Sequence, residues 1–125
     1  MKENFELTVI VPFYNEEKFF YKSVSELIKQ KFITEIILVN DASTDDSLRI
    51  ANEMLNQDKR LSLINLKKNS GKGNAVKEAL KEVHTSHVIV HDADLEYDPK
   101  DISLMFNKLS QNKDCLILGS RTLGK

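Results

Sequence analysis

Four short apolar runs, rich in Val, Ile and Leu, recur along the chain at similar intervals, and polar residues do not alternate cleanly within them. Such continuous runs are typical of strands buried on both faces of a parallel sheet. The predicted strands are Leu7–Val11, Glu35–Val39, Leu61–Leu66 and His87–Val90, and a last apolar run lies at Cys115–Leu118. Between the runs, apolar residues at helical spacing form stripes that can cover a sheet face. The stripes are Phe20/Val24/Leu27/Ile28, Leu48/Ala51/Leu55, Val76/Ala79/Leu80/Val83 and Ile102/Met105/Phe106/Leu109.

Residues that favour helix starts agree with this alternation. Ser43-Thr44-Asp45-Asp46 offers hydroxyl and acid caps to the second helix, with Asp45 as a cap, and Asp98-Pro99 places an acid before a first-turn proline at the fourth. The order is therefore βαβαβαβαβ. Right-handed crossovers then predict an α/β fold, with a mainly parallel sheet and helices on both faces, as one domain over residues 1–125.

Composition narrows the class of protein. With 41% hydrophobic and 30% charged residues, the 125-residue chain is typical of a globular domain. A formal net charge of -1 gives no basic face for nucleic acid. The single Cys115 excludes an internal disulfide, and no stretch approaches the ~20 apolar residues needed to cross a bilayer. We therefore expect a cytoplasmic protein, and a peripheral role at the membrane stays open.

Polar residues gather directly after each predicted strand, at positions 12–17, 40–45, 67–74 and 91–96. In a parallel sheet, ligands bind beyond the carboxyl ends of the strands. Four polar loops on one rim therefore predict a ligand site there.

The last of these loops carries two acids in alternate positions, Asp92 and Asp94, with Glu96 two residues further on. In an extended segment alternate side chains point to the same side, so the two carboxylates can converge on one hard cation. Mg²⁺ and Mn²⁺ prefer such oxygen ligands and commonly share them with substrate phosphates. The pattern favours a metal site of Asp92, Asp94 and Glu96 over a solvated acidic turn, although an Asp-X-Asp pair alone is a weak signal.

Two further loops offer ligand contacts. Asp41, after the second strand, is in a position where a carboxylate commonly accepts hydrogen bonds from a ribose or base, and its alternative role is an Asx-turn or helix cap. Gly71-Lys72-Gly73 precedes a helix, so its backbone N–H groups and the Lys72 charge suit an anion; a flexible turn with a solvated lysine explains it equally well.

The sequence excludes several other classes of binding site and protein. The glycine loop lacks Walker spacing, the first strand is not followed by GxGxxG, and no nucleophile elbow or zinc pattern is present. His84 and His87 are expected at the surface, and His91 near the site. A receiver-like signalling domain needs an acid after the third strand, where this chain has Asn65-Leu66-Lys67-Lys68.

Four motifs in order resemble those of family 2 glycosyltransferases, and a shorter signal follows them. They are Val9-Ile10-Val11-Pro12-Phe13-Tyr14-Asn15-Glu16-Glu17, Val39-Asn40-Asp41-Ala42-Ser43-Thr44-Asp45, Asn69-Ser70-Gly71-Lys72-Gly73-Asn74-Ala75, Asp92-Ala93-Asp94-Leu95-Glu96-Tyr97-Asp98-Pro99 and the signal Gly119-Ser120-Arg121. Ala42 departs from the glycine or serine usual there. The residues within these motifs most resemble those of the dolichyl- or polyprenyl-phosphate sugar synthases.

This resemblance implies a three-layer, Rossmann-like GT-A fold and inverting transfer of a sugar from a UDP- or GDP-sugar. It implies that Asp92 and Asp94 carry catalysis by holding Mg²⁺ or Mn²⁺ with Glu96. It also implies a set of ligand contacts: Pro12, Tyr14, Glu16, Asp41 and Asp92 for the nucleotide, and Lys72 and Arg121 for the phosphates. The acceptor that the resemblance implies is a polyprenyl phosphate or a glycan. A phosphate acceptor is already an anion and needs no protein base, whereas a hydroxyl acceptor does.

In the family that this chain resembles, the catalytic domain continues past the Gly-Ser-Arg signal. The expectation is therefore a donor-binding half that does not transfer sugar alone, and a non-catalytic nucleotide-sugar-binding module is the alternative. Such a half leaves sheet edges unpaired, which predicts a homodimer through an exposed edge. In a longer form the protein is expected at the cytoplasmic face of a membrane.

Overall fold

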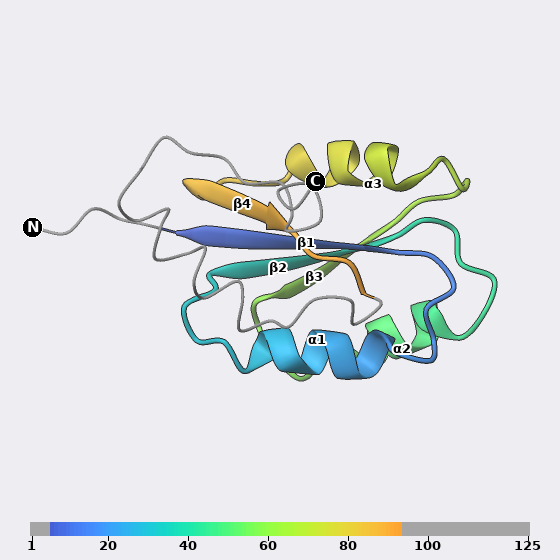
Figure 1. Cartoon of the computed structure of the whole chain (residues 1–125), viewed down its shortest axis with the longest axis horizontal. Helices are drawn as coiled ribbons and strands as arrows, with labels where there is room; N and C mark the ends of the chain where they lie inside the picture. Colours follow the sequence, from blue (N-terminus) through green and yellow to red (C-terminus); the bar gives the residue numbers. More distant parts are fainter. Residues whose placement is uncertain (1–5, 94–125) are drawn as a thin grey trace, which may run out of the picture.

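The computed structural model describes residues 6–93, which form four strands alternating with three helices (Figure 1). The strands are β1 (Leu7–Phe13), β2 (Glu35–Asn40), β3 (Leu61–Asn65) and β4 (His87–Val90), and the helices are α1 (Phe20–Ile28), α2 (Ser47–Met54) and α3 (Lys72–Leu80). The predicted strand and helix order is confirmed over this part of the chain. The predicted cap at Asp98-Pro99, the helix at 102–109 and the strand at Cys115–Leu118 lie outside the described residues.

The strands form one parallel sheet in the order β3-β2-β1-β4, and helices cover both of its faces (Figure 1). Helices α1 and α2 lie against one face and α3 against the other. The predicted three-layer α/β arrangement is therefore confirmed. All four strands run the same way, so their carboxyl ends and the loops that follow them lie at one end of the sheet.

The buried side chains of β1 and β2 explain why the sequence shows continuous apolar runs instead of alternation. Val9 and Val11 pack with Phe20, Val24 and other residues of α1 and α2 on one face. Ile10 packs with the α3 face through Ala75 and Ala79. Both faces of these strands are covered, so both sets of alternating side chains must be apolar.

Three sequence predictions are corrected in detail. Strand β1 runs two residues beyond the predicted Val11, and Pro12 is tolerated because β4 pairs with β1 only as far as Ile10. Leu80, predicted in the stripe of the third helix, is 38% exposed because it is the last residue of a short helix. His87, expected at the surface, is buried as the first residue of β4, with its Nδ1 2.8 Å from the Ser86 hydroxyl.

Hydrogen bonds from the Arg60 side chain join several segments at the amino-terminal end of the sheet. The Arg60 guanidinium donates to the Asp58 carboxylate at 3.0 Å and to the carbonyls of Gln30 and Ile33 at 2.9 Å. It also donates to the carbonyl of Ile28, the last residue of α1. The hydrogen bond from the Arg60 side chain holds the pKa of the Asp58 carboxyl below its usual value.

None of the helices within residues 6–93 is long and apolar enough to cross a membrane.

Candidate functional site

The loop after β1 is held to the loop after β2 through Asn15. The side-chain oxygen of Asn15 accepts from the backbone N–H groups of Thr44 and Asp45 at 2.7 and 3.2 Å. The backbone N–H of Asn15 donates to the Ser43 hydroxyl at 2.9 Å. Asn15 has a φ of 52°, in the left-handed region that asparagine tolerates better than most residues. This contact fixes the direction in which residues 14–16 leave the strand.

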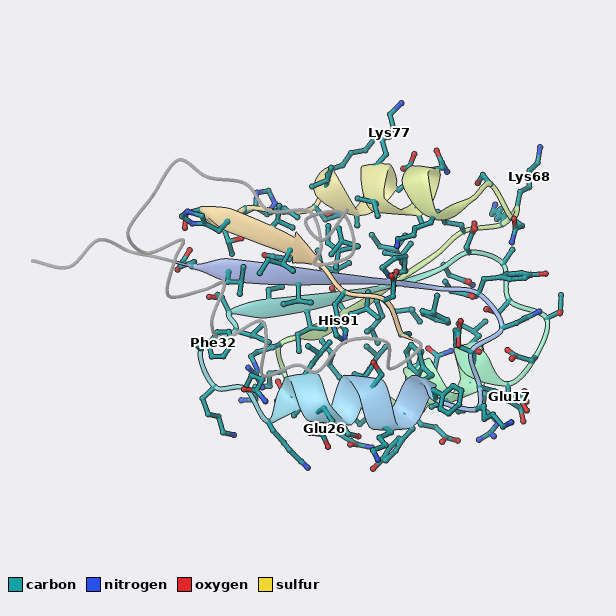
Figure 2. All side chains as sticks on the ribbon, viewed as in Figure 1. Glu17, Glu26, Phe32, Lys68, Lys77 and His91 are labelled. Atoms are coloured by element: carbon teal, nitrogen blue, oxygen red, sulfur yellow. The ribbon has the colours of Figure 1, made fainter. Side chains whose placement is uncertain are left out.

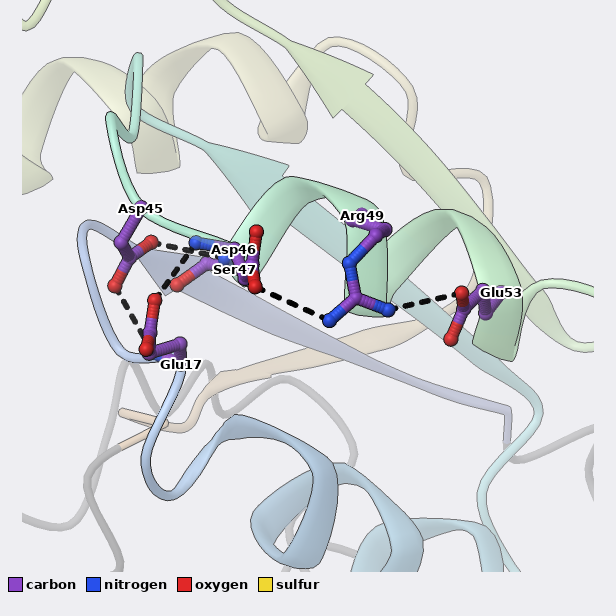
Figure 3. A network of polar contacts seen from close by, with 6 residues as sticks. All are labelled: Glu17, Asp45, Asp46, Ser47, Arg49 and Glu53. Atoms are coloured by element: carbon purple, nitrogen blue, oxygen red, sulfur yellow. Dashed lines mark hydrogen bonds and ion pairs between the residues drawn. The ribbon is translucent and has the colours of Figure 1, made fainter.

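A second set of contacts joins these loops to the start of α2 (Figure 3). The Asp45 carboxylate accepts from the N–H groups of Ser47 at 2.9 Å and Glu17 at 3.2 Å, and the Glu17 carboxylate accepts from Asp46 N–H at 2.8 Å. Desolvation raises the pKa of the Asp45 carboxyl, but the hydrogen bonds from Ser47 and Glu17 outweigh it and leave that pKa below its usual value. Asp46 is the residue at the N-cap position of α2, and the Asp45 oxygen bonds the first backbone N–H of the helix from one residue further back.

Asp41 directly follows β2 and holds the glycine loop that precedes α3. Its side chain is 4% exposed, and its two oxygens accept from the N–H groups of Ser70 at 3.0 Å and Gly71 at 2.9 Å. Asp41 therefore holds the loop that leads into α3, and neither hydrogen bond reaches an N–H group within that helix. Its predicted contact with a ribose or base stays a prediction.

Gly71 turns the chain into α3 with a φ of 94°, a conformation that residues with a Cβ rarely adopt. A Cβ added there would meet no atom within 4 Å, so the backbone angle and not crowding favours glycine. The turn places Lys72 as the first residue of α3.

Lys72 reaches from this helix to the loop after β4. Its Nζ lies 2.6 Å from Oδ1 of Asp92, whose side chain is only 14% exposed against 47% for the lysine. Asp92 follows the buried strand β4, and the backbone N–H of the neighbouring His91 donates to the Ile10 carbonyl at 2.8 Å. The ion pair thus joins the two loops on either side of the carboxyl end of β1.

These side chains surround one pocket of about 180 Å³ at the carboxyl ends of β1, β2 and β4. Every predicted nucleotide contact within the described residues lines it, and Phe13 and Ala93 complete the lining: Pro12, Phe13, Tyr14, Glu16, Asp41, Lys72, Asp92 and Ala93. Tyr14 stays 45% exposed. The structure brings the predicted residues together, while their individual roles stay predictions.

The other predicted site residues, Asp94, Glu96 and Arg121, lie outside the described residues. Across residues 6–93 no three His, Cys, Asp or Glu side chains group closely enough to hold a metal ion. Asp92 is therefore the one residue of the predicted metal set whose surroundings the structure describes. Its Oδ1 faces the Lys72 ammonium group, and its carboxylate oxygens are of the ligand type that hard cations prefer.

Sequence reasoning placed Asn40 in a polar pocket beside Asp41, but it did not single out Asn15, Ser70 or the pairing of Asn40 with Asn65. Asn40 is 2% exposed, donates to the Asn65 side-chain oxygen at 2.7 Å and accepts from Ser43 N–H at 2.9 Å. The signal in the sequence was an asparagine at the end of each neighbouring strand, where a side-chain amide can join two loops.

A protein-family model described as glycosyl transferase family 2 matches residues 8–124. Among curated proteins, a dolichyl-phosphate beta-glucosyltransferase of Trichomonas vaginalis is 31% identical over 132 residues, covering 95% of this chain and 40% of that protein. The chain thus spans well under half of this relative's length.

Two solved structures share the fold. A mannosyltransferase from Pyrobaculum calidifontis in complex with GDP-Man and Mn²⁺ has a TM-score of 0.73 at 25% identity, covering 84% of this chain and 31% of that one. The S. aureus protein TarS in complex with UDP-GlcNAc has a TM-score of 0.73 at 30% identity, and the match covers 85% of this chain and 31% of that one. The predicted GT-A fold is confirmed by these likenesses.

Proposed function

Since the chain belongs to glycosyl transferase family 2, we propose that it forms the donor-binding part of an inverting glycosyltransferase. The donor is a UDP- or GDP-sugar, and the favoured acceptor is a polyprenyl phosphate. The observation that carries the proposal is the pocket at the carboxyl ends of the strands, where Asp41, Lys72 and Asp92 meet from three separate loops.

The nucleotide is bound by the rim of the sheet. Pro12, Tyr14 and Glu16 line one side of the pocket, and the half-exposed Tyr14 ring leaves apolar surface for the nucleoside. Lys72 brings a positive charge to the amino-terminal end of α3, where anions are favoured. The 180 Å³ of this pocket is less than the roughly 300–1,000 Å³ of a small-molecule site, so these residues form part of the binding surface.

Asp92 is proposed to hold Mg²⁺ or Mn²⁺ together with Asp94 and Glu96. The fit rests on its largely buried carboxylate, which offers the oxygen ligands that hard cations prefer, and on its position in the pocket. A bound divalent cation would act as a Lewis acid that neutralises charge on the departing nucleoside diphosphate. The P. calidifontis mannosyltransferase, solved with GDP-Man and Mn²⁺, supports a divalent metal beside the donor.

Transfer requires that an acceptor oxygen bond to C1 of the sugar while the bond from C1 to the diphosphate oxygen breaks. A polyprenyl phosphate brings an anionic oxygen, so no proton has to be removed from it. A hydroxyl acceptor needs a general base. The similarity to a dolichyl-phosphate beta-glucosyltransferase favours the phosphate acceptor.

Saturation-transfer NMR with UDP-glucose and GDP-mannose in the presence of Mg²⁺ tests donor binding. We expect saturation of nucleoside and sugar protons for one donor, its loss in Asp92→Asn, and its retention in Asp46→Asn, a matched control at an exposed acid outside the pocket. Equal signals from the two variants would contradict the proposal. Incubation of the bound donor, radiolabelled, with polyprenyl phosphate then separates an enzyme from the alternative, a non-catalytic nucleotide-sugar-binding module.

A further inference from the structure

We propose that Lys72 is a placeholder for the divalent cation, pairing with Asp92 until metal and nucleoside diphosphate bind together and then moving onto the diphosphate. The proposal rests on the proposed function, because it assumes a metal at Asp92 and a diphosphate in the pocket. It adds that the two ligands are coupled through one side chain.

The contact itself suggests the exchange. The Lys72 Nζ lies 2.6 Å from Asp92 Oδ1, so the ammonium group occupies space next to the oxygen that a cation would ligate. Divalent cations of this class sit about 2.0–2.2 Å from carboxylate oxygens. An ammonium group and a divalent cation cannot share that position, and at such short range their like charges repel. Metal binding at Oδ1 of Asp92 therefore requires Lys72 to leave.

Lys72 is the partner that is able to move. Its side chain is 47% exposed on a flexible four-carbon stem, whereas the Asp92 side chain is 14% exposed at the end of a buried strand. The base of Lys72 is fixed, because Asp41 holds the N–H groups of Ser70 and Gly71 just before it. Only the end of the lysine side chain has to swing, and it stays within the same pocket.

The exchange makes the two ligands favour each other. A metal ion that binds alone displaces Lys72 and leaves its charge without compensation beside the metal. A diphosphate offers the displaced ammonium group a new anionic partner. By linkage, metal then raises the affinity for diphosphate and diphosphate raises the affinity for metal by the same factor.

The test compares Mn²⁺ binding, followed by the electron paramagnetic resonance signal of free Mn²⁺, in the wild-type chain, Lys72→Met and Lys77→Met. Lys77 is a matched control because it is an exposed lysine on the same helix that extends away from the sheet (Figure 2). Without any nucleotide, Lys72→Met is expected to bind Mn²⁺ roughly three- to tenfold more tightly, the range for losing a partly exposed ion pair near a cation. Lys77→Met is expected to match the wild type.

The same titrations with GDP or UDP at saturating concentration measure the coupling. We expect the factor by which nucleotide tightens Mn²⁺ binding to fall at least threefold in Lys72→Met and to be kept in Lys72→Arg, which retains the charge. Unchanged Mn²⁺ affinity with weaker nucleotide binding in Lys72→Met would make Lys72 a simple phosphate contact and overturn the placeholder role alone. A wild-type chain that binds neither GDP nor UDP with Mn²⁺ would instead contradict the proposed function.

Discussion

Replacing Asp41 by asparagine is expected to loosen the loop that leads into α3. The two carboxylate oxygens of Asp41 each accept one backbone N–H, from Ser70 and from Gly71, and the side chain is 4% exposed. Asparagine keeps the shape but has one acceptor oxygen, so its NH₂ group would face a second donor. One N–H group of the loop would then lose its partner in a nearly buried place.

The cost follows from these two contacts. A hydrogen bond to a charged group contributes about 1.5–3 kcal/mol, and a buried donor left without a partner costs about 1–3 kcal/mol. One bond is lost and the other is weakened by the loss of charge, so we expect the free energy of unfolding to fall by about 2–4 kcal/mol. That is a large part of the roughly 5–15 kcal/mol of a typical domain.

Urea denaturation followed by circular dichroism at neutral pH measures this change. Asp46→Asn is the control, because the Asp46 carboxylate is 61% exposed and pairs with Arg49 on the surface, where an ion pair contributes about 0–1 kcal/mol (Figure 3). An Asp41→Asn variant within about 0.5 kcal/mol of the wild type would refute the reasoning, since surface substitutions vary by that much.

Binding separates the two roles of Asp41. A loosened loop displaces Lys72, so affinity for inorganic pyrophosphate and for UDP or GDP should fall together in Asp41→Asn. A loss confined to the nucleotides, with pyrophosphate binding unchanged, would instead support the predicted contact with the base or ribose.

Four further outcomes are expected. Arg60→Lys should lower the free energy of unfolding by about 2 kcal/mol without changing nucleotide affinity, because the lost carbonyl and Asp58 contacts lie at the end of the sheet away from the pocket. Folding lowers the pKa of Asp58, so the stability that its carboxylate contributes is complete above its unfolded pKa of about 3.9 and is lost as the pH falls through the lower folded value. Acid titration of Asp58→Asn should therefore show a smaller loss of stability than the wild type. Asn15→Gly, which tolerates the φ of 52°, should destabilise by about 1 kcal/mol in thermal unfolding, and Asn15→Ala by about 1 kcal/mol more through strain. Sedimentation should show a dimer if a sheet edge pairs between chains, and a monodisperse monomer would contradict that prediction.

The sequence predicted the strands and the helix order because burial on both faces leaves an unmistakable apolar run. Val9 and Ile10 face opposite cores, and no register or contact has to be known to see that both are apolar. The ends of elements were less predictable. Leu80 continues the helical period of α3 but lies at its exposed end, and His87 is a polar residue that the first position of β4 buries.

The contacts within the site were beyond the sequence because they join loops about thirty residues apart. Asn15 bonds to residues 43–45, and Asp41 bonds to residues 70 and 71, only because the parallel register places consecutive strand ends side by side. Motif spacing predicted which loops carry the polar residues. It did not show that Asp41 holds the loop before α3 or that Lys72 pairs with Asp92.

The most direct test of the account is calorimetry with UDP and GDP, with Mn²⁺ and then with a chelator, on the wild-type chain and Asp92→Asn. The account predicts that one nucleoside diphosphate binds with Mn²⁺, that chelation abolishes the binding heat, and that Asp92→Asn weakens the metal-dependent binding while the fold is retained by circular dichroism. Equal nucleotide affinity with Mn²⁺ and with chelator would contradict the metal-dependent donor site at Asp92.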